Sequence, residues 1–200
     1  MVRRVVVALL APVRWTPPGI DPTRWRSALA EDVVDLLATL NEVETAVAVT
    51  PEDRRLADAV VWPGTAVHEV PEPTVDAVFA TLTGYDQAAV VVADAPDVPG
   101  LTLGKLLRPL SSRPVAVAPV EGSGTGLLGV AARLPVPAWL PALDLDTAAP
   151  AEVRAAAPRP GDVAVTAGWR RLRGPADLAS LDPAFEGWEA TRALLSGQPG

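Results

Sequence analysis

The chain has 200 residues, 49% hydrophobic and 20% charged, which is enough apolar material for one folded domain with a small appendage. Its formal net charge of -7 makes nucleic acid an unexpected partner. The chain has no cysteine and one histidine, which excludes disulfides, thiolate catalysis, cysteine-based zinc sites and multi-histidine metal cages. No apolar run approaches the roughly 20 residues of a membrane helix, so we expect a cytoplasmic protein without a membrane partner.

Five short apolar runs lack the alternation of a strand with one wet face, which is typical of strands buried on both faces of a parallel sheet. These runs are Val5–Leu10, Ala46–Val49, Ala88–Ala93, Val115–Ala118 and Leu127–Val130. The first run follows two arginines, as in a signal peptide. It is short, however, and Pro17 and Pro18 come soon after it. We therefore interpret it as the first buried strand.

Amphipathic segments between these runs predict helices. Apolar residues recur every three to four positions in residues 24–40, and a second helix is expected to begin near Pro51. Two more are expected at residues 74–82 and 101–110. The alternation predicts a three-layer α/β/α fold with a mostly parallel, mixed sheet.

The composition changes after Val130, where prolines interrupt the chain and leave room for one short helix near residues 151–157. We expect residues 1–157 to form the α/β domain. Residues 158–200 are expected to form a C-terminal extension that packs on this domain or on a partner subunit, as in a homodimer. In that extension Arg170, Arg171 and Arg173 follow Trp169, a pattern that fits a phosphate-binding cluster or a solvated or interface patch.

A carboxylate follows the third apolar run, in the segment VVVADAPD that ends at Asp97. In open α/β sheets the ligand crevice lies beyond the carboxyl ends of the strands, where Asp94 is expected. Magnesium there would suit one or two carboxylates together with phosphate oxygens. The same Asp94 and Asp97 also fit a plain turn that caps the next helix.

A second acidic pair is Asp144 and Asp146, in the segment LDLDT. Residues two apart on an extended chain point the same way, so these two carboxylates could share one cation. Asp146 or Thr147 equally fits the N-cap of the short helix that follows.

A glycine-rich segment, EGSGTGLLG, covers residues 121–129. Its alternate glycines allow close approach of the backbone to an anion. The candidate nucleotide-binding residues are Gly122, Ser123, Gly124, Thr125 and Gly126. The segment lacks the lysine of a phosphate-binding P-loop, and Pro135 and Pro137 leave too little room for the crossover helix of a dinucleotide fold. A plain glycine hairpin is the alternative.

His68 has no evident catalytic partner, and we interpret it as a structural or surface residue.

Taken in order, the segments VVVADAPDVPG, APVEGSGTGLLGV and ALDLDTAAPAEV resemble blocks of the nucleotidyltransferase and glycosyltransferase-A-like superfamily. The nearest members are 2-phospholactate guanylyltransferase and related bacterial glycosyltransferase-like proteins. The resemblance implies attack of an acceptor phosphate on a nucleoside triphosphate, with Mg²⁺ or Mn²⁺ as cofactor. It implies Asp94 and Asp146 as metal ligands, with Asp97 and Asp144 as further candidates. The loop of residues 122–126 would then contact the nucleotide or the acceptor.

The chain departs from this family after the first strand, where members carry a basic loop that clamps the triphosphate. Here Arg14 is the one basic residue of that loop and thus the catalytic candidate, unless Arg24 or Arg26 substitutes for the missing charges. Three functions stay open: a nucleotidyltransferase acting on a small phosphorylated acceptor, a non-catalytic relative that serves as a binding or assembly module, and a sugar-nucleotide glycosyltransferase.

Overall fold

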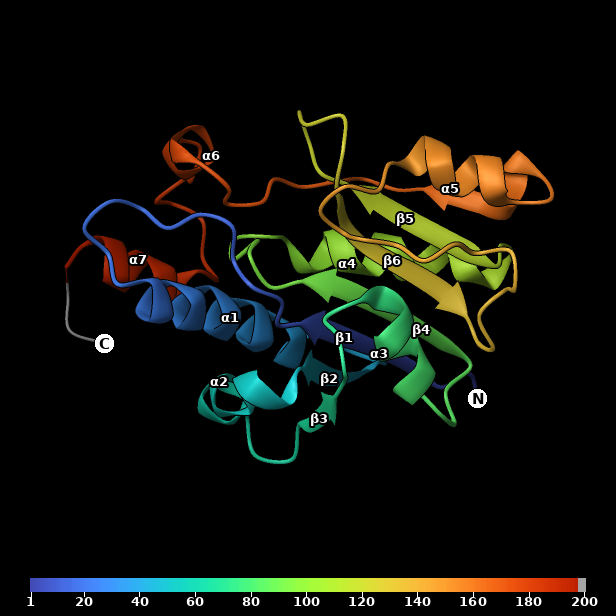
Figure 1. The fold of residues 1–200 in the computed structure, drawn as a ribbon, viewed down its shortest axis with the longest axis horizontal. Coiled ribbons are helices and arrows are strands. Elements are labelled where there is room, and N and C mark those ends of the chain that lie inside the picture. The colour runs from blue at the N-terminus through green and yellow to red at the C-terminus, as the bar shows by residue number, and fades with distance from the viewer. Residues whose placement is uncertain (198–200) are drawn as a thin grey trace.

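A computed structural model describes residues 1–197 of the chain. It contains a single seven-stranded sheet, and the valine-rich runs form the middle of that sheet (Figure 1). The strands are β1 (Arg4–Leu9), β2 (Glu44–Val49), β3 (Ala66–Glu69), β4 (Gln87–Val92), β5 (Val115–Pro119), β6 (Leu127–Arg133) and β7 (Val163–Val165). Every residue of β4 is buried, as expected for a strand covered on both faces.

The strand order is β3-β2-β1-β4-β6-β5-β7. Parallel pairing joins β3, β2, β1 and β4, and also β5 and β7, while β6 runs antiparallel to both of its neighbours. The expectation of a mixed, mostly parallel α/β sheet is therefore confirmed.

The helices fall close to the amphipathic segments. They are α1 (Pro22–Ala38), α2 (Arg54–Val60), α3 (Val75–Thr81), α4 (Gly100–Leu107), α5 (Pro150–Ala156), α6 (Pro175–Ala179) and α7 (Glu189–Leu195). The Asp21 side chain accepts the Arg24 N–H and so caps α1. Within residues 1–197 none of these helices has the length and apolar character needed to cross a membrane.

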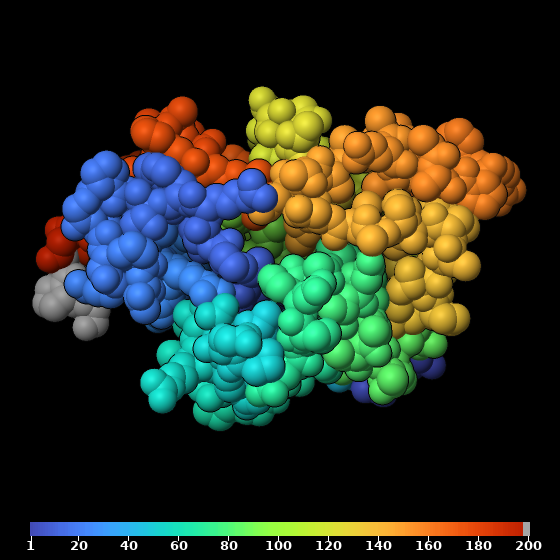
Figure 2. Space-filling view, in the orientation of Figure 1, coloured from blue at the N-terminus to red at the C-terminus, as the bar shows by residue number. Residues whose placement is uncertain are grey.

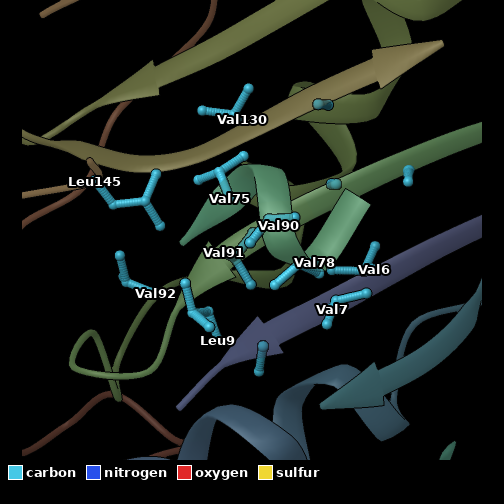
Figure 3. Packing of buried hydrophobic residues seen from close by; sticks show 14 of the residues in the cluster. Val6, Val7, Leu9, Val75, Val78, Val90, Val91, Val92, Val130 and Leu145 are labelled. Carbon is cyan, nitrogen blue, oxygen red and sulfur yellow. The ribbon is translucent and has the colours of Figure 1, made fainter. Parts of the chain in front are cut away.

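The core lies against the sheet, where side chains from β1, β4 and β6 meet those of the covering helices. Figure 3 shows Val75 and Val78 of α3 close to Val90 and Val91 of β4. Because these side chains are almost completely buried, they hold α3 over the carboxyl end of β4. This packing fixes one wall of the site described below.

A second, smaller core joins the beginning and the end of the chain. Trp25 and Leu29 of α1 pack against Leu172, and the Trp25 indole N–H donates to the Trp15 carbonyl at 2.9 Å. Helix α7 lies beside α1 (Figure 1). Leu172 and α7 thus pack on the α/β body, and β7 extends its sheet.

Candidate functional site

A cleft of about 400 Å³ opens at the carboxyl ends of β1 and β4. Strands β2 and β3 follow one edge of β1, whereas β4 pairs with its other edge, so the cleft lies where the strand order reverses. Its walls come from the segment after β1, the start of α3, the end of β4 and the segment before α5. The lining comprises Leu9, Ala11, Pro12, Val13, Arg14, Pro73, Thr74, Val75, Val92, Ala93, Asp94, Leu143, Asp144, Leu145, Asp146 and Arg171. Figure 2 shows these segments around a recess in the surface.

Asp94 follows β4 and reaches the cleft as a buried carboxylate. Its side chain is 7% exposed and accepts two hydrogen bonds from Arg171, from Nε at 2.6 Å and from Nη2 at 2.9 Å. The Asp94 backbone carbonyl also accepts the Leu172 N–H at 2.9 Å. Side chain and backbone together therefore bind Asp94 to the segment 170–173.

Asp146 lies on the opposite wall of the cleft and contacts three arginines. Arg171 Nη1 lies 2.9 Å from Oδ1, Arg173 also donates to Oδ1, and Arg14 Nε donates to Oδ2 at 2.6 Å. Burial opposes the ionised form of Asp146, but these three guanidiniums outweigh burial and hold the pKa of the carboxyl below its usual value. Asp146 is thus an anion in the resting protein.

Asp144 is exposed and shapes the turn that presents Asp146. Its Oδ1 accepts the Asp146 N–H at 2.8 Å, and its carbonyl accepts the Ala148 N–H at 2.9 Å. The N-cap residue of α5 is Ala149, so the alternative in which Asp146 or Thr147 caps that helix is wrong. A turn of this kind leaves the Asp146 carboxylate free to meet the arginines.

Asp97 does not line the cleft. Its carboxylate is 1% exposed and pairs with Arg170, while the Trp169 indole N–H donates to it at 3.1 Å. The next helix, α4, has Pro99 at its N-cap, so Asp97 does not cap it. We assign Asp97 a positioning role: it binds the segment that carries Arg171.

The glycine-rich loop is the connection of a β5–β6 hairpin. The antiparallel pairing of these strands excludes the crossover of a dinucleotide fold. Residues 122–125 are exposed, and none of residues 122–126 lines the cleft. Gly126, at the base of the loop, lies beside the arginine cluster, since a Cβ there would be 3.3 Å from Arg173 Nη1.

Arg171 and Arg173, two of the three arginines that contact the carboxylates, lie on an extended segment within the predicted C-terminal extension. Trp169 bridges to Val120, and Gly168 makes this possible because a Cβ there would lie 2.1 Å from the Pro119 carbonyl oxygen. Arg171 and Arg173, two residues apart, both contact Asp146. The expectation of a solvated patch is wrong for Arg171, which is 7% exposed.

The remaining candidates lie outside the cleft. Arg24 does not line it, and Arg26 pairs with Asp53 and donates to the Leu10 carbonyl. His68 is on β3, where burial lowers its pKa and its Nε2 has no hydrogen-bond partner. Its interpretation as a non-catalytic residue fits this position.

The carboxylates have the right chemistry for Mg²⁺, which prefers six oxygen ligands at about 2.1 Å, but their arrangement does not fit it. All four oxygens of Asp94 and Asp146 already contact a guanidinium. Within residues 1–197 no three histidine, aspartate or glutamate side chains converge as metal ligands would. The guanidinium of Arg171 occupies the position between Asp94 and Asp146.

No protein-family model and no curated protein matches the chain. Solved structures match it over its whole length. A candidate nucleotide-diphospho-sugar transferase from Desulfovibrio desulfuricans G20 is 15% identical with a TM-score of 0.64, covering 98% of each chain. Rv0371c from Mycobacterium tuberculosis H37Rv, solved with manganese, is 16% identical with a TM-score of 0.58 and the same coverage. CMP:2-keto-3-deoxy-manno-octonic acid synthetase, solved with CTP, is 14% identical with a TM-score of 0.55, again over 98% of each chain.

These similarities confirm the glycosyltransferase-A-like fold and the resemblance to the nucleotidyltransferase superfamily as a likeness of fold. At such identities they do not carry residue roles across. The function must therefore be argued from the cleft itself.

Proposed function

We propose that the cleft binds a nucleoside triphosphate and that the protein is a nucleotidyltransferase acting on a small phosphorylated acceptor. The observation that carries this proposal is the position of Arg14 and Arg171 beside Asp94 and Asp146, at the reversal point of the strand order. The CTP complex of a protein with the same fold supports a nucleotide as the ligand class.

The cleft offers two kinds of surface to such a ligand. Val13, Val75 and Leu143 provide an apolar wall suited to a base and ribose. Arg14, whose side chain is 59% exposed, is free to turn from Asp146 toward a phosphate. Arg171 supplies a fixed positive charge at the floor, where charge on the phosphates would develop.

In the proposed reaction, an oxygen of the acceptor phosphate forms a bond to the α-phosphorus of the nucleotide. The bond from that phosphorus to the bridging oxygen breaks, and pyrophosphate leaves with the electron pair. The attacking oxygen is already anionic, so the step needs no general base. The residues of this chain would orient the phosphates and offset their charge. We assign no step to Mg²⁺ or Mn²⁺, since the carboxylates implied as metal ligands are bound to arginines.

Nucleotide binding can be measured by calorimetry and by thermal unfolding with each nucleoside triphosphate. A bound nucleotide at a hundred times its dissociation constant adds about 2.7 kcal/mol to the free energy of unfolding. Arg14→Ala should weaken binding at least about tenfold through loss of a charge-assisted contact. Arg24→Ala is the matched control, because Arg24 is exposed and lies outside the cleft. Equal weakening by both variants would contradict the proposed site.

A second candidate is a non-catalytic binding or assembly module, and the arginine contacts of Asp94 and Asp146 favour it. Three arginines against two carboxylates leave little net charge for a triphosphate that carries about four negative charges. An assay of pyrophosphate release with a panel of phosphorylated acceptors separates the two candidates. Nucleotide binding without release would favour the module.

The fold of the Desulfovibrio structure supports a sugar-nucleotide glycosyltransferase as a further candidate. Binding of nucleoside diphosphate sugars in preference to triphosphates would favour it. The homodimer through residues 158–200 remains a prediction, which light scattering in solution would test.

A further inference from the structure

We propose that Arg171 is a built-in cation that takes the place of a divalent metal between Asp94 and Asp146, so that the cleft excludes Mg²⁺ and Mn²⁺. One guanidinium contacts both carboxylates: Nε and Nη2 bind Asp94, and Nη1 lies 2.9 Å from Asp146 Oδ1. Two acidic groups 52 positions apart in the chain thus meet at a single positive charge.

The Arg171 side chain is held in this position from several directions. It is 7% exposed, and Nη1 also donates to the Leu145 carbonyl at 3.1 Å. The next residue, Leu172, is buried against Trp25 and Leu29. Because the backbone on either side is fixed, the guanidinium cannot leave the carboxylates by a simple turn of an exposed side chain, as Arg14 can.

A metal at this place would meet both steric and electrostatic opposition. Mg²⁺ needs oxygen ligands at about 2.1 Å in octahedral geometry, and the planar guanidinium fills the space between the two carboxylates. Arg173 adds positive charge at the same Asp146 oxygen, and Arg14 adds it at the other oxygen. A dication would therefore have to displace one buried cation while lying beside two more.

This inference about metal exclusion stands on the geometry of the cleft alone. Its consequence for ligands rests on the proposed function: the cleft should still bind a nucleotide when EDTA removes divalent ions. If no nucleotide binds at all, the proposed function fails, whereas metal exclusion is still decided by metal binding alone.

Electron paramagnetic resonance of Mn²⁺ tests the inference, because the six-line signal of the free ion disappears on binding. The wild-type chain should leave about 1 mM Mn²⁺ unbound. Arg171→Ala frees both oxygens of Asp94, removes one of the three arginines from Asp146 and opens space for a hydrated ion, so it should bind one Mn²⁺ at least about tenfold more tightly than the wild type. Adding Asp94→Asn to Arg171→Ala should abolish that binding. Arg173→Ala, which leaves Arg171 in place, is the matched control and should bind no Mn²⁺.

Two results would overturn the inference. One is a wild-type chain that binds one Mn²⁺ and loses it on Asp94→Asn. The other is a folded Arg171→Ala chain, checked by circular dichroism, that leaves all Mn²⁺ free. Should Arg171→Ala not fold, Arg171→Met keeps most of the apolar stem while removing the charge, and the wild-type measurement decides metal exclusion by itself.

Discussion

The carboxylate of Asp32, buried on α1, accepts the backbone N–H of Thr191 at 2.9 Å and so binds the first turn of α7 to the body of the protein. Its second oxygen accepts the Ala190 N–H, also at 2.9 Å. Burial raises the pKa of Asp32 to about 6, although both hydrogen bonds favour the ionised form. The attachment of α7 is therefore coupled to pH.

We predict that this coupling makes the protein less stable as the pH rises from about 4 to about 6. The pKa of Asp32 is higher in the folded chain, about 6, than its ordinary value of 3.8, so the folded state binds more protons in this window. Stability then falls with rising pH, by about 3 kcal/mol for a shift of this size, and is constant above the folded pKa.

Urea unfolding of the wild type and of Asp32→Asn at several pH values measures this effect. Other carboxylates, such as Asp146 with its lowered pKa, oppose the trend, so the quantity of interest is the difference between the two chains. That difference should change by about 3 kcal/mol across the window, in favour of the wild type at low pH. A difference independent of pH would refute the prediction.

Gly168→Ala should destabilise the protein by about 3 kcal/mol, because the new Cβ would lie 2.1 Å from the Pro119 carbonyl oxygen. The chain would have to move at the point where Trp169 bridges to Val120, just before Arg171. Thermal or urea unfolding measures the loss.

Gly104→Ala is the control for this prediction, because Gly104 lies in α4 and the new Cβ would have no neighbour within 4 Å apart from the backbone of its own helix. Alanine there should stabilise the chain by about 0.5–1 kcal/mol. Similar losses for both variants would show that the close approach at Gly168 is not the cause.

The sequence predicts the middle of the sheet well, because a strand buried on both faces is a continuous run of apolar residues. The apolar runs of β1 and β4 are continuous valine, alanine and leucine. By contrast β3 and β7 are short strands at the two edges of the sheet, and each contains exposed residues. Without a continuous apolar run, such strands have no signal that distinguishes them from loops.

The acidic residues of the candidate site can be predicted from the sequence, whereas the arginine between them cannot. Asp94 could be placed at the crevice because it follows a buried strand, a rule that needs no knowledge of distant residues. Its partner, Arg171, comes 77 residues later. No local pattern pairs these two residues. The two-residue spacing of Arg171 and Arg173 is the one sequence feature that indicates a shared contact. It can be interpreted in this way only when the segment that carries them is known to be extended and packed on the domain.

Substitution of the two arginines that line the cleft should cost different amounts of stability. Arg171→Ala leaves Asp94 as a buried carboxylate without its partner, so the free energy of unfolding should fall by about 3–5 kcal/mol. Arg14→Ala breaks a pair in which the arginine side chain is 59% exposed and leaves Asp146 with two other arginines, so the loss should stay below about 1 kcal/mol.

Urea unfolding measures both losses as shifts of the midpoint, provided that the dependence of the free energy of unfolding on urea concentration stays the same. The double variant Asp94→Ala/Arg171→Ala should lose less than the sum of its two single variants, because the second substitution removes the charge that the first leaves unpaired. Equal costs for Arg14→Ala and Arg171→Ala would mean that the Arg171 pair is as hydrated as a surface contact. A hydrated Arg171 could leave the carboxylates without penalty, and the cleft would then be open to a metal ion after all.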